Sequence, residues 1–154
     1  MTNTLCVRSA IFEDISGIQN LLKEYAKAGD LLPRNRQELA DNIHHFRVIE
    51  ADSKLIACGS LEHFSDELAE VRSLVVDINY KGKNLGRMIV QDIIRIAKTR
   101  HVKRLMALTY VPGFFKKLDF RIVNKEIFPE KVWGICVNCV KFHNCDEIAV
   151  LLEL

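Results

Sequence analysis

The hydrophobic positions of this chain recur with two different periods, which predict helices in some segments and strands in others. In the first helical segment apolar side chains return every three or four residues and form one face; they are Ile15, Ile18, Leu21, Leu22 and Tyr25. A second such face consists of Leu85, Met88, Ile89, Ile93, Ile96 and Ala97. Asn35 followed by Glu38 is typical of a helix start and predicts a short helix through Ile43. The segment 112–118 suits one or two helical turns, because proline is tolerated near a helix start.

Shorter apolar segments between these helices predict strands. Their ranges are 5–8, 46–50, 55–62, 68–76, 104–109, 120–123 and 148–152, with a turn at 51–54. The order is strand, two helices, three strands, helix, strand, helix, strand, an irregular cysteine-bearing segment at 128–147, and a last strand. This order predicts a mixed α/β fold. The length of 154 residues predicts one domain over 1–154, with no regulatory domain beside it.

Composition and charge exclude several classes of function. Apolar residues make up 49% of the chain and charged residues 27%, which is typical of a globular protein rather than a disordered one. A net charge of +2 is too small to attract nucleic acid or a membrane surface by bulk charge. The apolar runs are too short to span a membrane, and the first residues do not resemble a signal peptide. With an odd count of five cysteines we expect no disulfide framework, and we expect a cytoplasmic protein.

The loop between the strand at 68–76 and the helix that begins at Leu85 carries the clearest chemical signal. Gly82 and Gly86 let the backbone approach a ligand, and the first N–H groups of the helix carry partial positive charge. Lys81, Lys83 and Arg87 concentrate basic side chains at the same place. Such a turn binds phosphate or pyrophosphate, although the spacing is neither that of a P-loop nor GxGxxG. Taken alone, the loop is equally compatible with a solvated basic turn before an ordinary helix.

The sequence Lys81-Gly82-Lys83-Asn84-Leu85-Gly86 resembles the (Arg/Gln)-x-x-Gly-x-(Gly/Ala) loop of the GCN5-related N-acetyltransferase (GNAT) superfamily. Lys81 replaces the Arg or Gln, and Asn84 replaces the middle glycine, for which asparagine is the next best residue at a positive φ. A second family pattern, an aromatic residue followed later by Gly-Phe, is present at 114–120, with Asp119 at the usual glycine. The order of elements along the whole chain agrees with this resemblance.

The resemblance implies a mixed, mostly antiparallel sheet flanked by helices, with two central strands that splay apart. It implies acetyl-CoA as cosubstrate, with its pyrophosphate on the loop 81–87. The pantetheine arm would bond like an extra strand to the backbone of Leu74, Val75 and Val76, and the thioester would lie near the end of the strand at 104–109. Phe115 is the further residue that the resemblance places beside the cofactor.

Four stretches narrow the resemblance to amino-acid N-acetyltransferases, the N-acetylglutamate synthase group of arginine biosynthesis. They are 31–34, 69–74, 108–110 with 114–115, and 128–133. The chain is similar to a short form of these enzymes that lacks an amino-acid-kinase domain. The resemblance implies glutamate as the leading acceptor. After Trp133, however, the family's basic and hydroxyl residues that help to hold the substrate are not recognisable in this chain.

Acyl transfer from a thioester to an amine needs a group that takes the ammonium proton. Glu70, a few residues before the stretch that would bind the cofactor, is the candidate base. The alternatives are a solvent-facing charge and an ion-pair partner of Arg72. In an ideal strand Leu68, Glu70, Arg72 and Leu74 share one face, which suits a polar cleft or an exposed surface.

Arg34 and Arg72 are the candidates for binding a substrate carboxylate through paired guanidinium donors. The resemblance places Arg34 in a loop that folds over the substrate; the alternative is a surface arginine. Many relatives protonate the departing thiolate with a tyrosine, but the aligned residue here is Phe115, which has no hydroxyl. Tyr110 is the local phenol, and the alternatives are water as the acid and a packing or groove-lining role for Tyr110.

Cys136, Cys139 and Cys145 have part of the spacing of a metal site. A tetrahedral zinc site needs a fourth ligand, for which His143, Asp146 or Cys58 is available. Inert buried thiols are the preferred interpretation, so no metal is predicted, with zinc and a redox pair as alternatives.

The sequence therefore predicts an acetyl-CoA-dependent N-acetyltransferase in which the amine of a free amino acid attacks the thioester directly. One alternative acceptor class is a protein N-terminus, a polyamine or another small amine. A non-catalytic acyl-CoA sensor is a different class, suggested by Phe115 and the imperfect loop, and a zinc-stabilised interaction module in the tail is a third. A homodimer is compatible with the sequence.

Overall fold

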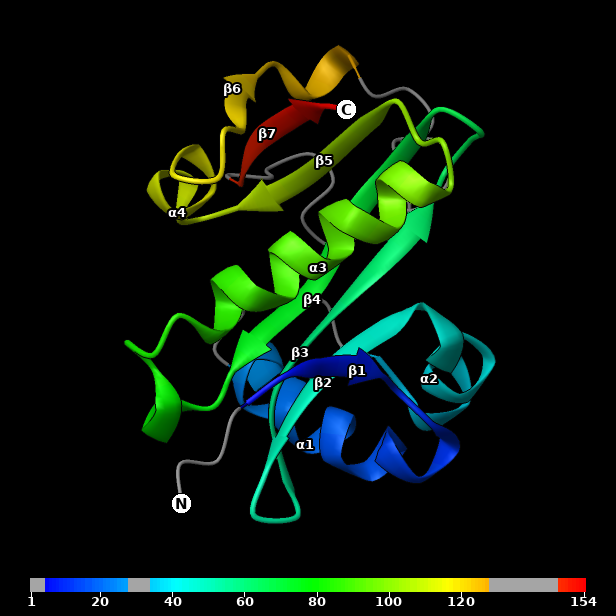
Figure 1. Cartoon of the computed structure of the whole chain (residues 1–154), viewed down its shortest axis with the longest axis vertical. Helices are drawn as coiled ribbons and strands as arrows, with labels where there is room; N and C mark the ends of the chain where they lie inside the picture. The colour runs from blue at the N-terminus through cyan, green and yellow to red at the C-terminus, as the bar shows by residue number, and fades with distance from the viewer. Residues whose placement is uncertain (1–4, 28–33, 128–146) are drawn as a thin grey trace. The chain divides into compact units, whose positions relative to one another are not determined.

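The computed structural model describes residues 5–27, 34–127 and 147–154 (Figure 1). Its strands are β1 (Val7–Ser9), β2 (Phe46–Ala51), β3 (Lys54–His63), β4 (Leu68–Val76), β5 (Arg104–Thr109), β6 (Arg121–Val123) and β7 (Ile148–Glu153). Its α-helices are α1 (Ile15–Lys27), α2 (Arg36–Asp41), α3 (Leu85–Thr99) and α4 (Pro112–Lys116), with short 3-10 turns at Phe12–Asp14, Ile43–His45, Ile78–Tyr80 and Lys125–Ile127. The predicted order of strands and helices is confirmed.

The strands form one mixed sheet in the order β1-β2-β3-β4-β5-β7-β6. The pairs β1–β2, β2–β3, β5–β7 and β6–β7 are antiparallel. β4 and β5 are parallel, with Leu68 opposite Arg104 and Glu70 opposite Met106. The fold class predicted from the sequence, a mixed and mostly antiparallel sheet with flanking helices, is therefore confirmed.

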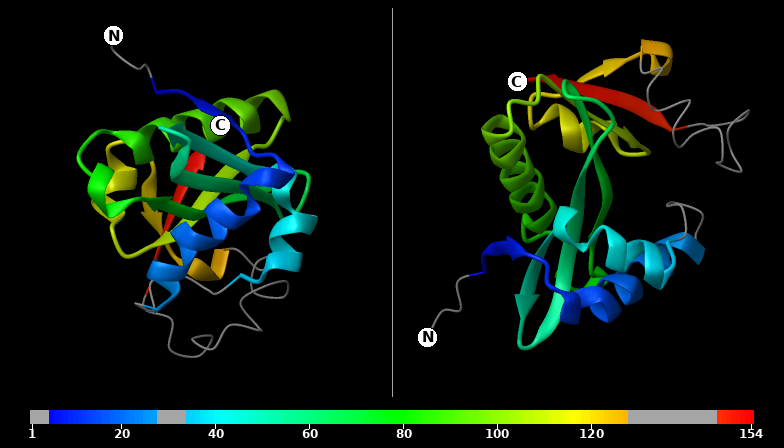
Figure 2. Two further views of the ribbon diagram at one scale, coloured as in Figure 1. Left: turned by 90° about the horizontal axis from the view of Figure 1, so that it is seen from below. Right: turned by 90° about the vertical axis from the view of Figure 1, so that its right-hand side faces the viewer.

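The chain divides into two compact units, one of Met1–Leu61 with Ser73–Ile94 and the other of Glu62–Arg72 with Arg95–Leu154. In the first unit α1 and α2 cover one face of β2 and β3, and the beginning of α3 covers the opposite face (Figure 2). The α1–α2 side is closed by a cluster of buried apolar residues; they are Ala10, Ile15, Ile18, Leu21, Leu22, Leu39, Phe46, Val48, Leu55, Cys58 and Val75. The amphipathic pattern of α1 in the sequence is thus explained by burial of this face.

A glycine in β3 allows α3 to approach the sheet closely. A Cβ atom on Gly59 would lie 2.6 Å from Cγ2 of Ile89 and 3.3 Å from Cδ1 of Leu74. Because the β-branched Ile89 side chain is stiff, it has little freedom to move aside. Gly59 therefore sets the distance between α3 and β3, and the sequence pattern alone did not indicate this role.

The second unit is built on the antiparallel strands β5, β6 and β7 together with α4. Its core contains the buried residues Leu68, Met106, Ala149 and Leu151, with Phe64, Leu108 and Val123 packed against them. β6 and β7 are the last strands of the described chain. The cysteine-bearing segment 128–146 lies outside the described residues.

Several predicted element bounds differ from the observed ones by one or two residues. β1 begins at Val7 rather than at residue 5, and α2 ends at Asp41 rather than at Ile43. Asn42 adopts φ −117° and ψ 14°, and its N–H donates to the carbonyls of Glu38 and Leu39, which closes the helix. The start of α2 is as predicted, since the Asn35 side chain accepts a hydrogen bond from the Glu38 N–H at 2.8 Å.

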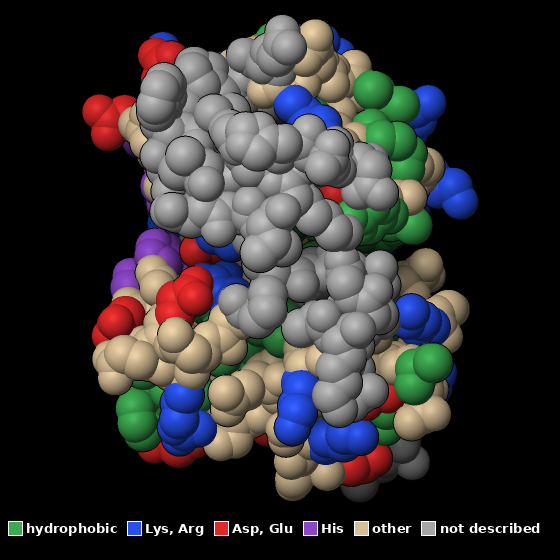
Figure 3. Space-filling view, turned by 180° about the vertical axis from the view of Figure 1, so that it is seen from behind, with side chains coloured by type: hydrophobic (Ala, Val, Ile, Leu, Met, Phe, Trp, Pro, Cys, Tyr) green, Lys and Arg blue, Asp and Glu red, His purple; other side chains and the backbone are tan. Residues whose placement is uncertain are grey.

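The surface carries charges of both signs. On the face shown in Figure 3, the described Lys and Arg side chains lie among Asp and Glu side chains rather than in one basic field. This mixture agrees with the net charge of +2. Within the described ranges, none of the helices has both the length and the apolar character needed to cross a membrane.

Candidate active site

The loop that leads from β4 to α3 is anchored at its first residue. The backbone N–H of Asp77 donates to the carbonyl of Ile56 in β3 at 2.8 Å. The Asp77 carboxylate accepts a hydrogen bond from the Asn79 N–H at 2.8 Å and lies 3.2 Å from the Lys54 ammonium. The bond from Asn79 and then the contact with Lys54 hold the pKa of Asp77 below its usual range. The loop therefore leaves the sheet in a fixed direction.

Two residues of this loop adopt left-handed backbone conformations. Gly82 has φ +83°, and no atom lies within 4 Å of the position where a Cβ would stand, so the glycine serves conformation rather than packing. Asn84, which occupies the usual glycine position, has φ +63°. Its carbonyl accepts the hydrogen bond from the Met88 N–H at 3.0 Å that begins α3. The expectation that asparagine replaces glycine at a positive φ is confirmed.

The loop ends where α3 presents its first backbone N–H groups. These groups have no partner within the helix and carry the positive end of its dipole. Lys81, Lys83 and Arg87 are exposed around them, and the Lys83 ammonium lies 5.3 Å from the centroid of the Tyr80 ring. The predicted concentration of positive charge at a helix start is therefore present in the structure, and it suits a phosphate or pyrophosphate group.

A half-buried arginine between two carboxylates lies in the second unit. Arg72 Nη1 is 3.2 Å from Glu62 Oε2, and Arg72 Nε is 3.6 Å from Glu70 Oε1. Glu70 is only 2% exposed. The alternative of a solvent-facing Glu70 is thus wrong, and the alternative of a partnership with Arg72 is confirmed. The guanidinium compensates the burial of the carboxylate, which would be costly without it.

Arg34 is buried as well, so the alternative of a surface arginine is wrong. Its side chain is 2% exposed, and its Nε donates to Glu38 Oε1 at 2.9 Å. Its Nη1 donates to Ser73 Oγ at 2.8 Å, and its guanidinium carbon lies 5.2 Å from the centroid of the Phe46 ring. The partners of Arg34 in these contacts, Glu38, Ser73 and Phe46, all belong to the first unit.

Ser73 departs from ideal strand geometry in the middle of β4. Its φ is +53°, so the alternation expected for an ideal strand over Leu68–Leu74 does not hold at this residue. Its carbonyl accepts a hydrogen bond from Cys58 Sγ at 3.4 Å. Burial raises the pKa of the Cys58 thiol to about 12, which keeps that thiol protonated. Sequence reasoning did not find Ser73 or Glu62, and it assigned Glu38 only to the start of α2, because no motif marks the contacts of these residues with Arg34 and Arg72.

Tyr110 and Phe115 occupy different environments. Tyr110 is 39% exposed and follows Thr109, whose Oγ1 accepts a hydrogen bond from the Val111 N–H at 2.9 Å. Phe115 is buried, and its ring makes edge-to-face contacts with Phe114 at 5.0 Å and with Phe120 at 5.2 Å. Packing against these two rings therefore explains much of the burial of Phe115. A contact between Phe115 and the cofactor stays a prediction.

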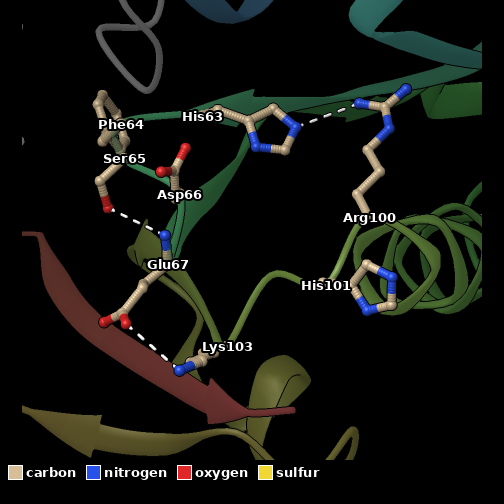
Figure 4. Close-up of a pocket in the computed structure, with 8 residues that line it drawn as sticks. All are labelled: His63, Phe64, Ser65, Asp66, Glu67, Arg100, His101 and Lys103. Carbon is tan, nitrogen blue, oxygen red and sulfur yellow. Dashed lines mark hydrogen bonds and ion pairs between the residues drawn. The ribbon is translucent and has the colours of Figure 1, made fainter.

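A polar hollow in the second unit has an ion-pair network of its own (Figure 4). It is lined by His63, Phe64, Ser65, Asp66, Glu67, Arg100, His101 and Lys103. The Arg100 guanidinium points to the His63 ring at 3.2 Å, and Lys103 lies 3.4 Å from Glu67. Burial and then the charge of Arg100 lower the pKa of His63. Two pairs of these side chains thus contact each other, and the mainly apolar lining of a typical small-molecule site is lacking here.

The described part of the chain contains no cluster of three or more His, Cys, Asp or Glu side chains that could hold a metal ion. Cys6 is exposed and Cys58 is buried, and both are free thiols. Cys136, Cys139 and Cys145 lie outside the described residues, so the interpretation of the tail stays a prediction.

Comparison with known proteins decides the family. Residues 13–120 match the family model described as the Acetyltransferase (GNAT) family. The chain belongs to the GNAT family. An uncharacterized N-acetyltransferase of Chlorobaculum tepidum is 34% identical over 149 residues, which cover 97% of this chain and 96% of that protein. An amino-acid acetyltransferase of Buchnera aphidicola is 32% identical over 80% of this chain, which spans only 28% of that relative's length.

Solved structures show the same GNAT fold. Rv2747 from Mycobacterium tuberculosis, in complex with CoA and a second ligand, superimposes with a TM-score of 0.82 and 26% identity. The match covers 96% of this chain and 98% of that one. Acetyl-CoA is therefore the cosubstrate of this GNAT protein, and the family, fold and cosubstrate predicted from the sequence are all confirmed.

Proposed function

We propose that this GNAT acetyltransferase transfers the acetyl group of acetyl-CoA to the amine of a free amino acid, with glutamate as the first candidate. The observation that carries the proposal is the combination on β4 of a buried carboxylate, Glu70, with the anion-binding turn that follows the same strand. A base and a cofactor loop are the two parts that direct acyl transfer to an amine requires. The similarity to an amino-acid acetyltransferase supports the choice of acceptor.

The first unit holds the cosubstrate in this proposal. Lys81, Lys83 and Arg87 neutralise the pyrophosphate, and the N–H groups at the start of α3 donate to its oxygens. Gly82 and Asn84 give the loop the left-handed turns that aim these N–H groups. The backbone of Leu74–Val76 bonds to the pantetheine arm. Acetyl-CoA supplies an acetyl thioester, and the chain supplies the binding, orientation and proton transfer.

Glu70 acts as the base. Its carboxylate takes a proton from the substrate ammonium, directly or through a water molecule, and the neutral nitrogen then forms a bond to the thioester carbonyl carbon. The carbon–sulfur bond breaks, and the sulfur takes a proton from Tyr110 or from water. The nitrogen, which carries an extra proton after the attack, gives that proton to the phenolate or hydroxide so formed, and a neutral amide and a thiol result. Arg72 lies 3.6 Å from the Glu70 carboxyl group and compensates its burial.

The charges around Arg72 bear on the nature of the acceptor. Arg72 is paired with the carboxyl groups of both Glu62 and Glu70, so its guanidinium is already engaged within the chain. Arg72 is therefore a weak candidate for binding the substrate carboxylate, and Arg34, the other predicted arginine, is likewise engaged by Glu38 and Ser73. The same observation favours a second candidate function, acetylation of an amine without a side-chain carboxylate, such as a polyamine, a small amine or a protein N-terminus.

The test is the release of free CoA thiol from acetyl-CoA by the purified chain, with one acceptor at a time. Turnover with glutamate that exceeds turnover with other amino acids supports the proposal. Turnover confined to polyamines or peptide N-termini replaces it with the second candidate. Tight CoA binding without transfer to any amine favours the acyl-CoA sensor.

A further inference from the structure

The left-handed residue Ser73 lies directly before Leu74, where the backbone proposed to bind the pantetheine arm begins. A non-glycine residue with φ +53° is uncommon because its Cβ crowds the backbone, so other contacts must hold it there. Ser73 is 9% exposed and is neither an asparagine nor an aspartate, the residues that adopt this conformation most readily after glycine. The conformation is therefore imposed by its surroundings.

Both polar groups of Ser73 are bound within the first unit. Its Oγ accepts a hydrogen bond from Arg34 Nη1 at 2.8 Å, and its carbonyl accepts one from Cys58 Sγ at 3.4 Å. The bond from Arg34 is charge-assisted and is the stronger of the two. Arg34 and Ser73 are 39 positions apart, so this bond joins the segment before α2 to the middle of β4.

Arg34 is itself held on several sides. Glu38 accepts from its Nε at 2.9 Å, and the Asn35 side chain caps the same turn by accepting from the Glu38 N–H. The ring of Phe46 lies 5.2 Å from the guanidinium carbon. A planar guanidinium donates in two fixed directions at once, which the single ammonium of a lysine does not reproduce. The geometry around Arg34 is thus that of a rigid support rather than of a mobile side chain.

We propose that Arg34 is a positioning residue for acetyl-CoA. By fixing the left-handed backbone of Ser73, it sets the direction of the N–H and C=O groups of Leu74–Val76, which follow in β4. The inference rests on the proposed function in one respect, namely that the pantetheine arm bonds to these backbone groups. This positioning role differs from direct binding of the amine substrate by Arg34, because it predicts an effect on CoA binding when no amine substrate is present.

The test is calorimetric measurement of the Kd for CoA on the full chain without any amino acid. Arg34→Lys and Ser73→Ala are each expected to weaken CoA binding about tenfold, the size of effect that follows from losing one charge-assisted hydrogen bond. Ser73→Gly is expected to keep the affinity within about threefold, because glycine adopts a positive φ without support. In the Ser73→Gly background, Arg34→Lys is expected to have little further effect, because the two residues act through one conformation.

Arg36→Lys is the matched control, because Arg36 also donates to a serine, Ser16 Oγ at 3.0 Å, from an exposed position in the same unit. Its CoA affinity should equal that of the wild type. Far-UV circular dichroism and thermal unfolding verify that each variant is folded, and Ser73→Ala, which loses one hydroxyl, serves if Arg34→Lys does not fold.

Three results overturn the inference. The first is an unchanged Kd for CoA in Arg34→Lys with a raised KM for the amino acid, which assigns Arg34 to the acceptor instead. The second is an equal loss of affinity from Arg34→Lys in the wild-type and Ser73→Gly backgrounds. The third, a wild-type chain that does not bind CoA, overturns the proposed function and this inference with it.

Discussion

Arg72 and Glu70, two residues apart in β4, form an ion pair in which Nε of the half-buried arginine lies 3.6 Å from Oε1 of the buried glutamate. Glu62 binds the other side of the same guanidinium. This carboxyl group lies on the strand that leads to the proposed cofactor loop, and Glu70 is therefore the base in the proposed reaction.

Replacing Glu70 by glutamine removes the base and keeps the shape of the side chain. We expect Glu70→Gln to lower kcat by about 10²- to 10⁴-fold, the usual contribution of a general base, without a change in the Kd for CoA. Glu67→Gln is the control, because Glu67 is more than half exposed and pairs only with the surface residue Lys103 in the ion pair at 3.4 Å. An equal loss of kcat in both variants, or none in either, contradicts the assignment.

An aspartate at Gly86 places a negative charge at the start of α3, where the pyrophosphate is proposed to lie. Because like charges a few ångströms apart near a protein surface repel by roughly 1 to 4 kcal/mol, we expect Gly86→Asp to weaken CoA binding at least about fivefold. Thermal unfolding should change little. Asn20→Asp adds the same charge at an exposed position of α1 and should leave the Kd unchanged. Unaltered affinity in Gly86→Asp rules out this loop as the pyrophosphate site.

The stability of the fold is expected to fall when even a single methyl group is added at Gly59. Its Cβ would lie 2.6 Å from Ile89 Cγ2, so Gly59→Ala must displace α3 or the strand. We expect a loss of about 1–3 kcal/mol in the free energy of unfolding, measured by urea denaturation. Gly113→Ala is the matched control, since its Cβ meets no atom within 4 Å, and alanine favours the helix in which it lies. Similar unfolding curves for Gly59→Ala and the wild type would refute the close approach.

The carboxylate of Asp77 should contribute stability that depends on pH. Its pKa is lower in the folded chain than the ordinary value of 3.8, so the contribution is complete above that value and is lost as the pH falls through the folded pKa. Asp77→Asn is therefore expected to be less stable than the wild type at pH 7, with a difference that shrinks as the solution becomes strongly acidic. Urea unfolding at a series of pH values measures the difference in the free energy of unfolding between the two proteins. A difference that grows in acid contradicts a stabilising role for the Asp77 carboxylate.

Much of the fold followed from local sequence patterns. β4 and β5 have the predicted bounds, because each is an apolar run that ends at polar or turn-forming residues. The start of α2 was predicted because the Asn35 cap is a local interaction. β1 was placed too early, since a strand of three residues has too few positions to show a clear alternation.

The candidate site was predictable only in part. The proposed cofactor loop was visible because its glycines, its lysines and the helix after it are contiguous in the sequence. The left-handed Ser73 was not, because serine within an apolar run carries no signal for a positive φ. Its partner Arg34 is 39 positions away, and which residue an arginine contacts depends on the packed strands and not on local pattern. The close approach of Ile89 to Gly59 was hidden for the same reason.

The choice of acceptor is tested most directly by competition. The purified chain is given acetyl-CoA with an equimolar mixture of the amino acids, a polyamine and a short peptide, and the acetylated products are identified by mass spectrometry. The predicted result is N-acetylglutamate as the principal product, lost in Glu70→Gln. A mixture in which the acetylated polyamine or peptide predominates, or in which no acetylated amine forms, would contradict the proposed function.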